Sequence, residues 1–129
     1  MPIKKLLERN AYTTAILITA FVTFSSLISL KGISLISIKI SNFDKIVHAI
    51  SYFILALSWF FATRSDFKKK NFKVILILLL ISFGIIIEAL QDGLTTYRQA
   101  DFYDILANSL GVLVAAIFFK KLNRWFNSI

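Results

Sequence analysis

The chain has 129 residues, a formal net charge of +8, no Cys and a hydrophobic content of 57%. Because a soluble domain is roughly 45–50% apolar, this composition indicates a protein whose solvent is lipid. The missing Cys excludes a disulfide framework and a thiolate metal site, and the length allows a single domain, residues 1–129.

Four apolar stretches are each close to the length that crosses a bilayer, which takes roughly 20 helical residues. We therefore expect an all-α, polytopic membrane protein with four transmembrane helices. The spans fall at residues 11–30, 46–63, 74–91 and 104–119. The first stretch is interpreted as a span rather than a signal peptide, because no Ala-x-Ala-like cleavage site is clear before Lys31. The last stretch is short, so either Lys120 snorkels or the helix begins before Asp104.

Residues 31–43 connect the first two spans, and residues 36–41 alternate Ile with Ser or Lys. This alternation is typical of an extended segment, here one lying at the membrane interface. Asn42 or Asp44 can cap the second helix, because a side-chain oxygen there accepts a free backbone N–H.

The Lys and Arg residues are divided unevenly between the two faces that four spans define. Eleven of the 15 lie in the N-terminal lead, the 64–73 loop and the C-terminal tail, and the other four lie on the opposite face. The positive-inside rule therefore predicts that both termini and the 64–73 loop are cytoplasmic. Five of the seven acidic residues lie on the opposite face, so the polar stretch between the third and fourth spans faces away from the cytoplasm.

The 64–73 loop contains Lys68, Lys69, Lys70 and Lys73. A basic run can bind nucleic acid, but a run between two membrane spans is better explained as an orientation signal that contacts anionic lipids. We expect anionic lipids as partners of this loop and no nucleic acid.

The second span opens with Asp44, Lys45, His48 and Tyr52. Asp44, His48 and Tyr52 are spaced by four residues and share one helix face. An Asp and a His on one face can support acid–base chemistry, hold a metal or bind a proton-linked ligand. The alternative is that Asp44 caps the helix while His48 bonds a neighbouring helix, and both interpretations stay open.

Glu88 and Gln91 share a face near the end of the third span. Glu88 follows a long apolar run, where burial disfavours the charged carboxylate. Such a carboxyl group can donate a proton near neutral pH. The alternative is an ordinary buried partner for Arg98 or Lys45.

Asp101, Asp104, Asn108 and Gly111 form one stripe on the fourth span. Gly111 allows close helix approach and Asn108 can bond across helices, but helix assembly explains the two Asp residues less well. Arg98 lies among acidic residues. It can clamp the loop through ion pairs or bind a phosphate or carboxylate.

Metal binding would draw on Asp44, His48, Glu88 and Asp104, which could supply oxygen and nitrogen ligands. Because no His-x-x-x-His or similar signature accompanies them, we expect no metal and no other cofactor.

Two motifs resemble those of the VanZ-like family of small bacterial integral membrane proteins. The first is Asp44-Lys45-Ile-Val-His48-x-x-x-Tyr52. The second is Glu88-x-x-Gln91 followed by Arg98-x-x-Asp101-x-x-Asp104-x-x-x-Asn108-x-x-Gly111. The chain departs from the family in having no Pro in the 92–99 turn. The resemblance implies a multi-helix protein of the bacterial cytoplasmic membrane and, for the family's namesake, a role in resistance to teicoplanin.

We expect the polar residues to converge into a site for an amphiphilic envelope molecule, with its head in the polar residues and its tail against the helices. A lipid-linked cell-wall precursor, a phospholipid or a lipoglycopeptide has that form. The expected ligand-binding residues are Asp44, Lys45, His48, Tyr52, Glu88, Gln91, Arg98, Asp101, Asp104 and Asn108.

Two other functions stay open. A membrane enzyme would use Glu88 or Asp104 as acid or base with His48 as its partner, although no nucleophile is identifiable. A structural subunit would use the polar residues only to assemble helices. Proton-coupled transport is disfavoured, because four spans leave little room for alternating access unless the protein forms oligomers.

Overall fold

The computed structural model describes residues 2–28, 43–94 and 100–129, and these residues form helices and turns without a strand. The expected all-α fold is confirmed. The helices are α1 (Pro2–Arg9), α2 (Ala11–Leu27), α3 (Phe43–Ala62), α4 (Lys70–Leu94) and α5 (Phe102–Ser128).

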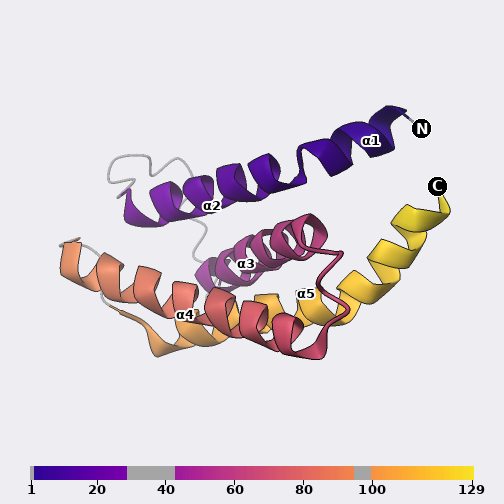
Figure 1. Cartoon of the computed structure of the whole chain (residues 1–129). Helices are drawn as coiled ribbons and strands as arrows, with labels where there is room; N and C mark the ends of the chain where they lie inside the picture. The colour runs from indigo at the N-terminus through magenta and orange to yellow at the C-terminus, as the bar shows by residue number, and fades with distance from the viewer. Residues whose placement is uncertain (1, 29–42, 95–99) are drawn as a thin grey trace.

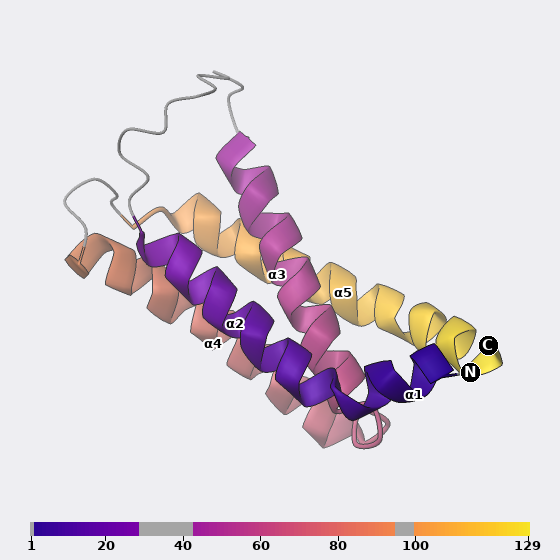
Figure 2. The same ribbon diagram turned by 90° about the horizontal axis from the view of Figure 1, so that it is seen from above.

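The centre of the bundle is the contact between α3 and α5, with α2 packed on α3 and α4 packed on α5 (Figures 1 and 2). α2 and α4 also touch, which closes the four long helices around one core. The core is aromatic and aliphatic. Its most buried members are Ala15, Tyr52, Leu55, Ala56, Phe60, Val112 and Ala115.

Gly111 explains why α3 and α5 approach so closely. A Cβ atom at this position would collide with the carbonyl oxygen of Ala49 and would lie 3.0 Å from the backbone nitrogen of Phe53. Only a residue without a side chain fits against the α3 backbone here. The expectation that Gly111 allows close helix approach is confirmed.

Three helices, α3, α4 and α5, are long and apolar enough to cross a membrane. α1 and α2 together qualify as a fourth span, although they meet at a bend of 57°. The chain is therefore a helical membrane protein with three or four candidate spans, consistent with the expected four.

α5 is longer than the apolar stretch within it. It begins before Asp104, which is one of the two expected ways of lengthening a short span, and it continues past residue 119 to Ser128. The extension packs on its neighbours, because the ring of Phe126 lies 4.6 Å from that of Phe61 on α3. The last turns of α5 therefore extend beyond its apolar stretch and pack on α3 through Phe126.

α2 is held to the other helices by two polar contacts. The indole N–H of Trp59 donates to Thr19 Oγ1 at 2.9 Å, and Gln91 Nε2 donates to the carbonyl oxygen of Ser26 at 2.8 Å. α2 therefore packs against α3 and α4 as part of the bundle.

Some expectations fall on the connections. The extended segment at residues 36–41, the cap at Asn42 and the role of Arg98 lie outside the described residues. Asp44 is the second residue of α3, in its first turn, so it does not cap the helix from outside as one of the two expectations had it.

Candidate functional site

The polar residues of α3, α4 and α5 meet at one end of the bundle, where α3 and α5 begin and α4 ends (Figure 2). We call this group the polar cluster. It consists of Asp44, Lys45, His48, Tyr52, Glu88, Asp101, Asp104 and Asn108. The side chains of Asp44, Lys45 and Asp101 reach solvent, whereas Tyr52, Glu88 and Asn108 are each 1% exposed. The cluster therefore has a charged rim and a buried floor.

Lys45 connects α3 to α5 through two carboxylates. Its Nζ lies 2.8 Å from Asp101 Oδ2 and 3.0 Å from Asp104 Oδ1. Asp104 is buried, so the Lys45 ammonium supplies a charge that its carboxylate needs in a low-dielectric setting. The contact with Asp101 is a charge-assisted hydrogen bond, which is the stronger kind, and the contact with Asp104 is an ion pair.

Asp101 has a second role as the N-cap of α5. Its Oδ1 accepts the backbone N–H of Tyr103 at 2.8 Å, which satisfies one of the free donors at the start of the helix. The hydrogen bond from Lys45, followed by the one from the Tyr103 N–H, holds the pKa of Asp101 below its ordinary value. The sequence placed Asp101 on the α5 stripe without indicating the cap.

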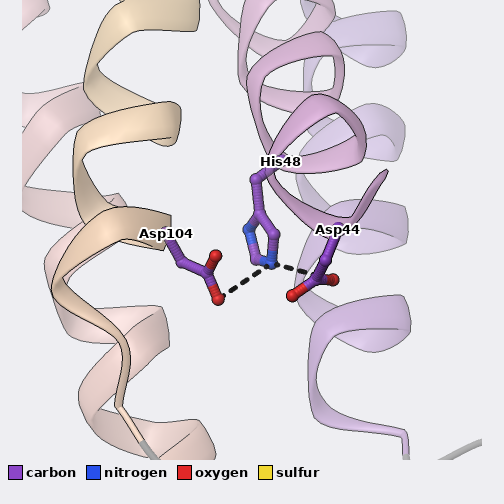
Figure 3. A group of neighbouring side chains, drawn as sticks. All are labelled: Asp44, His48 and Asp104. Carbon is purple, nitrogen blue, oxygen red and sulfur yellow. Dashed lines mark ion pairs between the residues drawn. The ribbon is translucent and has the colours of Figure 1, made fainter. Parts of the chain in front are cut away.

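His48 is the centre of the buried floor. Its Nδ1 lies 3.0 Å from Asn108 Oδ1, and this amide oxygen accepts from Nδ1 in the tautomer that carries its proton there. The other ring nitrogen, Nε2, lies 3.6 Å from Asp104 Oδ2 and 3.8 Å from Asp44 Oδ1. Figure 3 shows the two carboxylates on either side of this nitrogen. Nε2 is thus the atom through which the ring can exchange a proton.

Glu88 reaches the same place from α4. Its Oε1 lies 3.9 Å from His48 Nδ1, and its Oε2 accepts the backbone N–H of Asp101 at 3.4 Å. Glu88 therefore links the end of α4 to the start of α5. The sequence analysis named Lys45 as one ordinary ion-pair partner for Glu88. In the structure Lys45 forms its short contacts with Asp101 and Asp104.

Two donors on the floor are buried without a hydrogen-bond partner among the described residues. They are the hydroxyl group of Tyr52 and the amide nitrogen Nδ2 of Asn108. Gly84 on α4 makes room for both side chains, because a Cβ there would lie 3.1 Å from Tyr52 Cε1 and 3.4 Å from Asn108 Nδ2. Sequence reasoning missed Gly84, whose signal was a lone Gly inside an otherwise aliphatic helix.

Gln91 and Arg98 complete the set of expected site residues. Gln91 is buried, and its Nε2 is used for the contact with Ser26 on α2. Arg98 lies outside the described residues. The structure therefore brings eight of the ten expected residues into the polar cluster and places Gln91 beside α2.

A divalent cation could be held by Asp44, His48 and Asp104, whose ligand atoms all lie within 4.8 Å of one another. Protein ligands sit roughly 2.0–2.2 Å from zinc, so a small inward movement would be required. Lys45 already contacts Asp104 and would compete with the cation for its charge. The donor set fits a metal, whereas the sequence alone gave no metal signature.

The amino-acid sequence matches the VanZ/LLP1 family over residues 2–126. Searches of curated proteins and of solved structures found no match. The family match covers nearly all of α1–α5, including every residue of the polar cluster. The chain therefore belongs to the VanZ/LLP1 family.

Proposed function

We propose that the polar cluster binds the head group of an amphiphilic cell-envelope molecule whose tail lies along the apolar helices. The protein would sit in the bacterial cytoplasmic membrane with both termini in the cytoplasm and the cluster on the opposite side. A lipid-linked cell-wall precursor and a lipoglycopeptide such as teicoplanin both have the required form.

The observation that carries this proposal is the change from charged rim to buried floor at the end of apolar helices. The rim offers the side chains of Asp44, Lys45 and Asp101 to a ligand arriving from the membrane surface. The floor adds two buried donors, Tyr52 Oη and Asn108 Nδ2, which gain a hydrogen bond if a ligand acceptor reaches them. If the polar residues served only to assemble helices, buried donors without a hydrogen-bond partner would not be needed.

The charge of the cluster indicates the chemistry of the head group. Among its described residues the cluster has four carboxylates and one ammonium. Asp101 and Asp104 contact the Lys45 ammonium, whereas Asp44 and Glu88 lie near the His48 ring. Carboxylate acceptors in the cluster therefore outnumber its charged donors. A head group rich in hydroxyl or ammonium groups, as in sugar-bearing lipids and glycopeptides, fits this balance better than a bare phosphate does.

The test is native mass spectrometry of protein extracted gently from its own membrane. We expect wild type to retain a discrete ligand and Asp104→Asn to lose it while remaining folded, as judged by thermal unfolding. Asp66→Asn is the matched control, because Asp66 is an acidic residue outside the cluster that pairs with Lys69 on the surface. Equal retention in all three proteins would refute the proposal.

Loss of ligand that occurs only together with early melting would instead favour a structural subunit. A link to resistance would be tested in cells that express the protein. The proposal expects a rise in the teicoplanin concentration that inhibits growth, and it expects Asp104→Asn to remove that rise.

A membrane enzyme is the second candidate, and the geometry of His48 favours it. Asn108 holds one ring nitrogen and leaves Nε2 facing the carboxylates of Asp104 and Asp44, which is an arrangement suited to acid–base catalysis. The substrate would be a lipid-linked ester, phosphate or sugar. Product formation by wild type that disappears in both His48→Gln and Glu88→Gln would support the enzyme, whereas binding without turnover would exclude it for the ligand tested.

A further inference from the structure

A second polar feature lies toward the opposite end of the bundle, where the turn after α3 and the first turn of α4 lie beside residues 119–123 of α5; Figure 2 shows this turn and the start of α4 far from the start of α5. A cavity of about 320 Å³ is found there. Four cationic side chains line it, together with Asn123 and the rings of Phe67 and Phe119. The cations are Arg64, Lys68, Lys73 and Lys120. We call it the basic cavity, and the described residues that line it include no acid.

Arg64 is fixed in place beside this cavity. Its Nη2 contacts Glu8 Oε1 of α1 at 2.6 Å. The guanidinium carbon lies 4.8 Å from the centre of the Phe61 ring and 5.4 Å from that of Phe126. One edge of the guanidinium is thus paired and its planar faces are in contact with aromatic rings.

The remaining part of the guanidinium lacks a partner. Arg64 Nη1 is buried and has no hydrogen-bond partner among the described residues, and the same is true of Asn123 Oδ1. A buried charged donor that is left unpaired is costly. An anion such as a phosphate relieves this cost if it accepts from Arg64 Nη1. Lys68 and Lys120, which are exposed, add positive charge beside the same cavity.

An adjoining apolar cavity indicates what kind of molecule would carry this phosphate. This second cavity measures about 360 Å³ and shares Phe119 and Asn123 with the basic cavity. The rest of its lining is almost entirely apolar and includes Ile18, Leu57 and Trp125. A phospholipid has both parts, a phosphate for the basic cavity and an acyl chain for the apolar one.

We propose that the basic cavity is a binding site for an anionic phospholipid, with the phosphate on Arg64 and Lys120 and an acyl chain in the adjoining apolar cavity. Asn123 Oδ1 would accept a hydrogen bond from a hydroxyl group of the lipid head group. This site is separate from the polar cluster, and it turns the general expectation of lipid contact at the 64–73 loop into one pocket with named ligands.

The experiment uses the purified full-length chain in neutral detergent, with phosphatidylglycerol or phosphatidylcholine added and bound lipid measured by native mass spectrometry. Lys120→Ala is compared with Lys121→Ala, because Lys121 is the next residue on α5, carries the same charge and is not part of the cavity lining. We expect wild type and Lys121→Ala to bind phosphatidylglycerol equally and Lys120→Ala to bind it several-fold more weakly.

Three results would overturn the proposal. Equal weakening by Lys120→Ala and Lys121→Ala would mean diffuse charge attraction. Equal binding of the two lipids, which both carry a phosphate, would mean that the cavity does not select an anionic head group over a zwitterionic one. Inorganic phosphate that displaces phosphatidylglycerol at comparable concentration would identify a site for a free anion instead of a lipid. Arg64→Gln should weaken binding as well. Because this change also breaks the contact with Glu8, the comparison of Lys120→Ala with Lys121→Ala is the decisive test of the proposal.

Discussion

Lys45 is the residue through which α3 and α5 are joined at the polar cluster. One ammonium group contacts the carboxylates of Asp101 and Asp104, which belong to the start of a helix more than 50 residues later in the chain. The effect of removing it depends on burial, because Asp104 would be left as a carboxylate largely out of water. Lys69 provides a contrast, since it pairs with Asp66 on an exposed turn.

Lys45→Ala should therefore lower the Tm of the detergent-solubilised protein clearly, while Lys69→Ala should leave it almost unchanged, as is usual for an exposed ion pair. Adding Asp104→Asn to Lys45→Ala should recover part of the loss, because the second change removes the unpaired buried charge. Thermal unfolding of the four proteins tests this. An equal effect of the two Lys changes would show that the contacts of Lys45 do not stabilise the bundle.

Asp101 makes the stability of the same region depend on pH. Its pKa in the folded protein is below the ordinary value of 3.8, so folding favours the charged form. The stabilisation is complete above the pKa of the unfolded chain and is lost as the pH falls through the lower pKa of the folded chain. Asp101→Asn keeps a residue that can cap α5 but removes the charge.

We therefore expect Asp101→Asn to melt below wild type at neutral pH, and we expect the difference to shrink as the pH falls below about 4. Melting curves between neutral and acid pH measure it, with Asp66→Asn as the control because Asp66 is far from the cluster. A difference that stays constant at all pH values would mean that the ion pair with Lys45 is not its cause.

At the scale of helices, three glycines test how closely the elements pack. A Cβ at Gly111 would collide with the α3 backbone, and a Cβ at Gly84 would press on Tyr52 and Asn108 side chains. A Cβ at Gly93 would have nothing within 4 Å. Gly84 and Gly111 lie in helix interiors and Gly93 is the second-to-last residue of α4, so Ala has the better helix propensity at the first two, and the packing differs at all three.

Gly111→Ala should thus destabilise the protein by about 1–3 kcal/mol or more, which is typical of an overpacked core. Gly84→Ala should cost less, because side chains yield more readily than backbone, and Gly93→Ala should be neutral or stabilise by up to roughly 1 kcal/mol. Unfolding measurements on the three variants give the order. A neutral Gly111→Ala would show that α3 and α5 are farther apart than the structure has them.

The helices α3, α4 and α5 could be predicted from the sequence because each contains a long apolar run, and their polar ends could be predicted to meet because the charges lie on one side. The pairing of Lys45 with Asp101 and the contact of Gly84 with Tyr52 could not be predicted. Both depend on how the helices are rotated about their axes, and hydropathy does not record that rotation. The predicted span at 104–119 does not give the full length of α5, because hydropathy does not record the packing of Phe126 on Phe61 in its last turns.

For the molecule as a whole, the two ends of the bundle differ in charge. The polar cluster has an excess of carboxylates among its described residues, whereas the basic cavity is lined by cations. The termini lie at the basic end, where Lys4 of α1 lies 5.4 Å from the ring of Phe126 on α5 (Figure 2). The positive-inside rule predicts that this end is cytoplasmic, and we propose that orientation. The proposed ligand would then reach the polar cluster from outside the cell.

This orientation is testable because the chain has no Cys, so a single introduced Cys is a unique label. Leu94→Cys marks the end of α4 near the polar cluster, and Ser65→Cys marks the turn near the basic cavity; both positions are exposed. A membrane-impermeant maleimide added to intact cells should label the first variant and reach the second only after the membrane is opened. The opposite pattern would place the polar cluster in the cytoplasm, where a lipid-linked precursor before export would remain a suitable ligand but an antibiotic acting outside the cell would not.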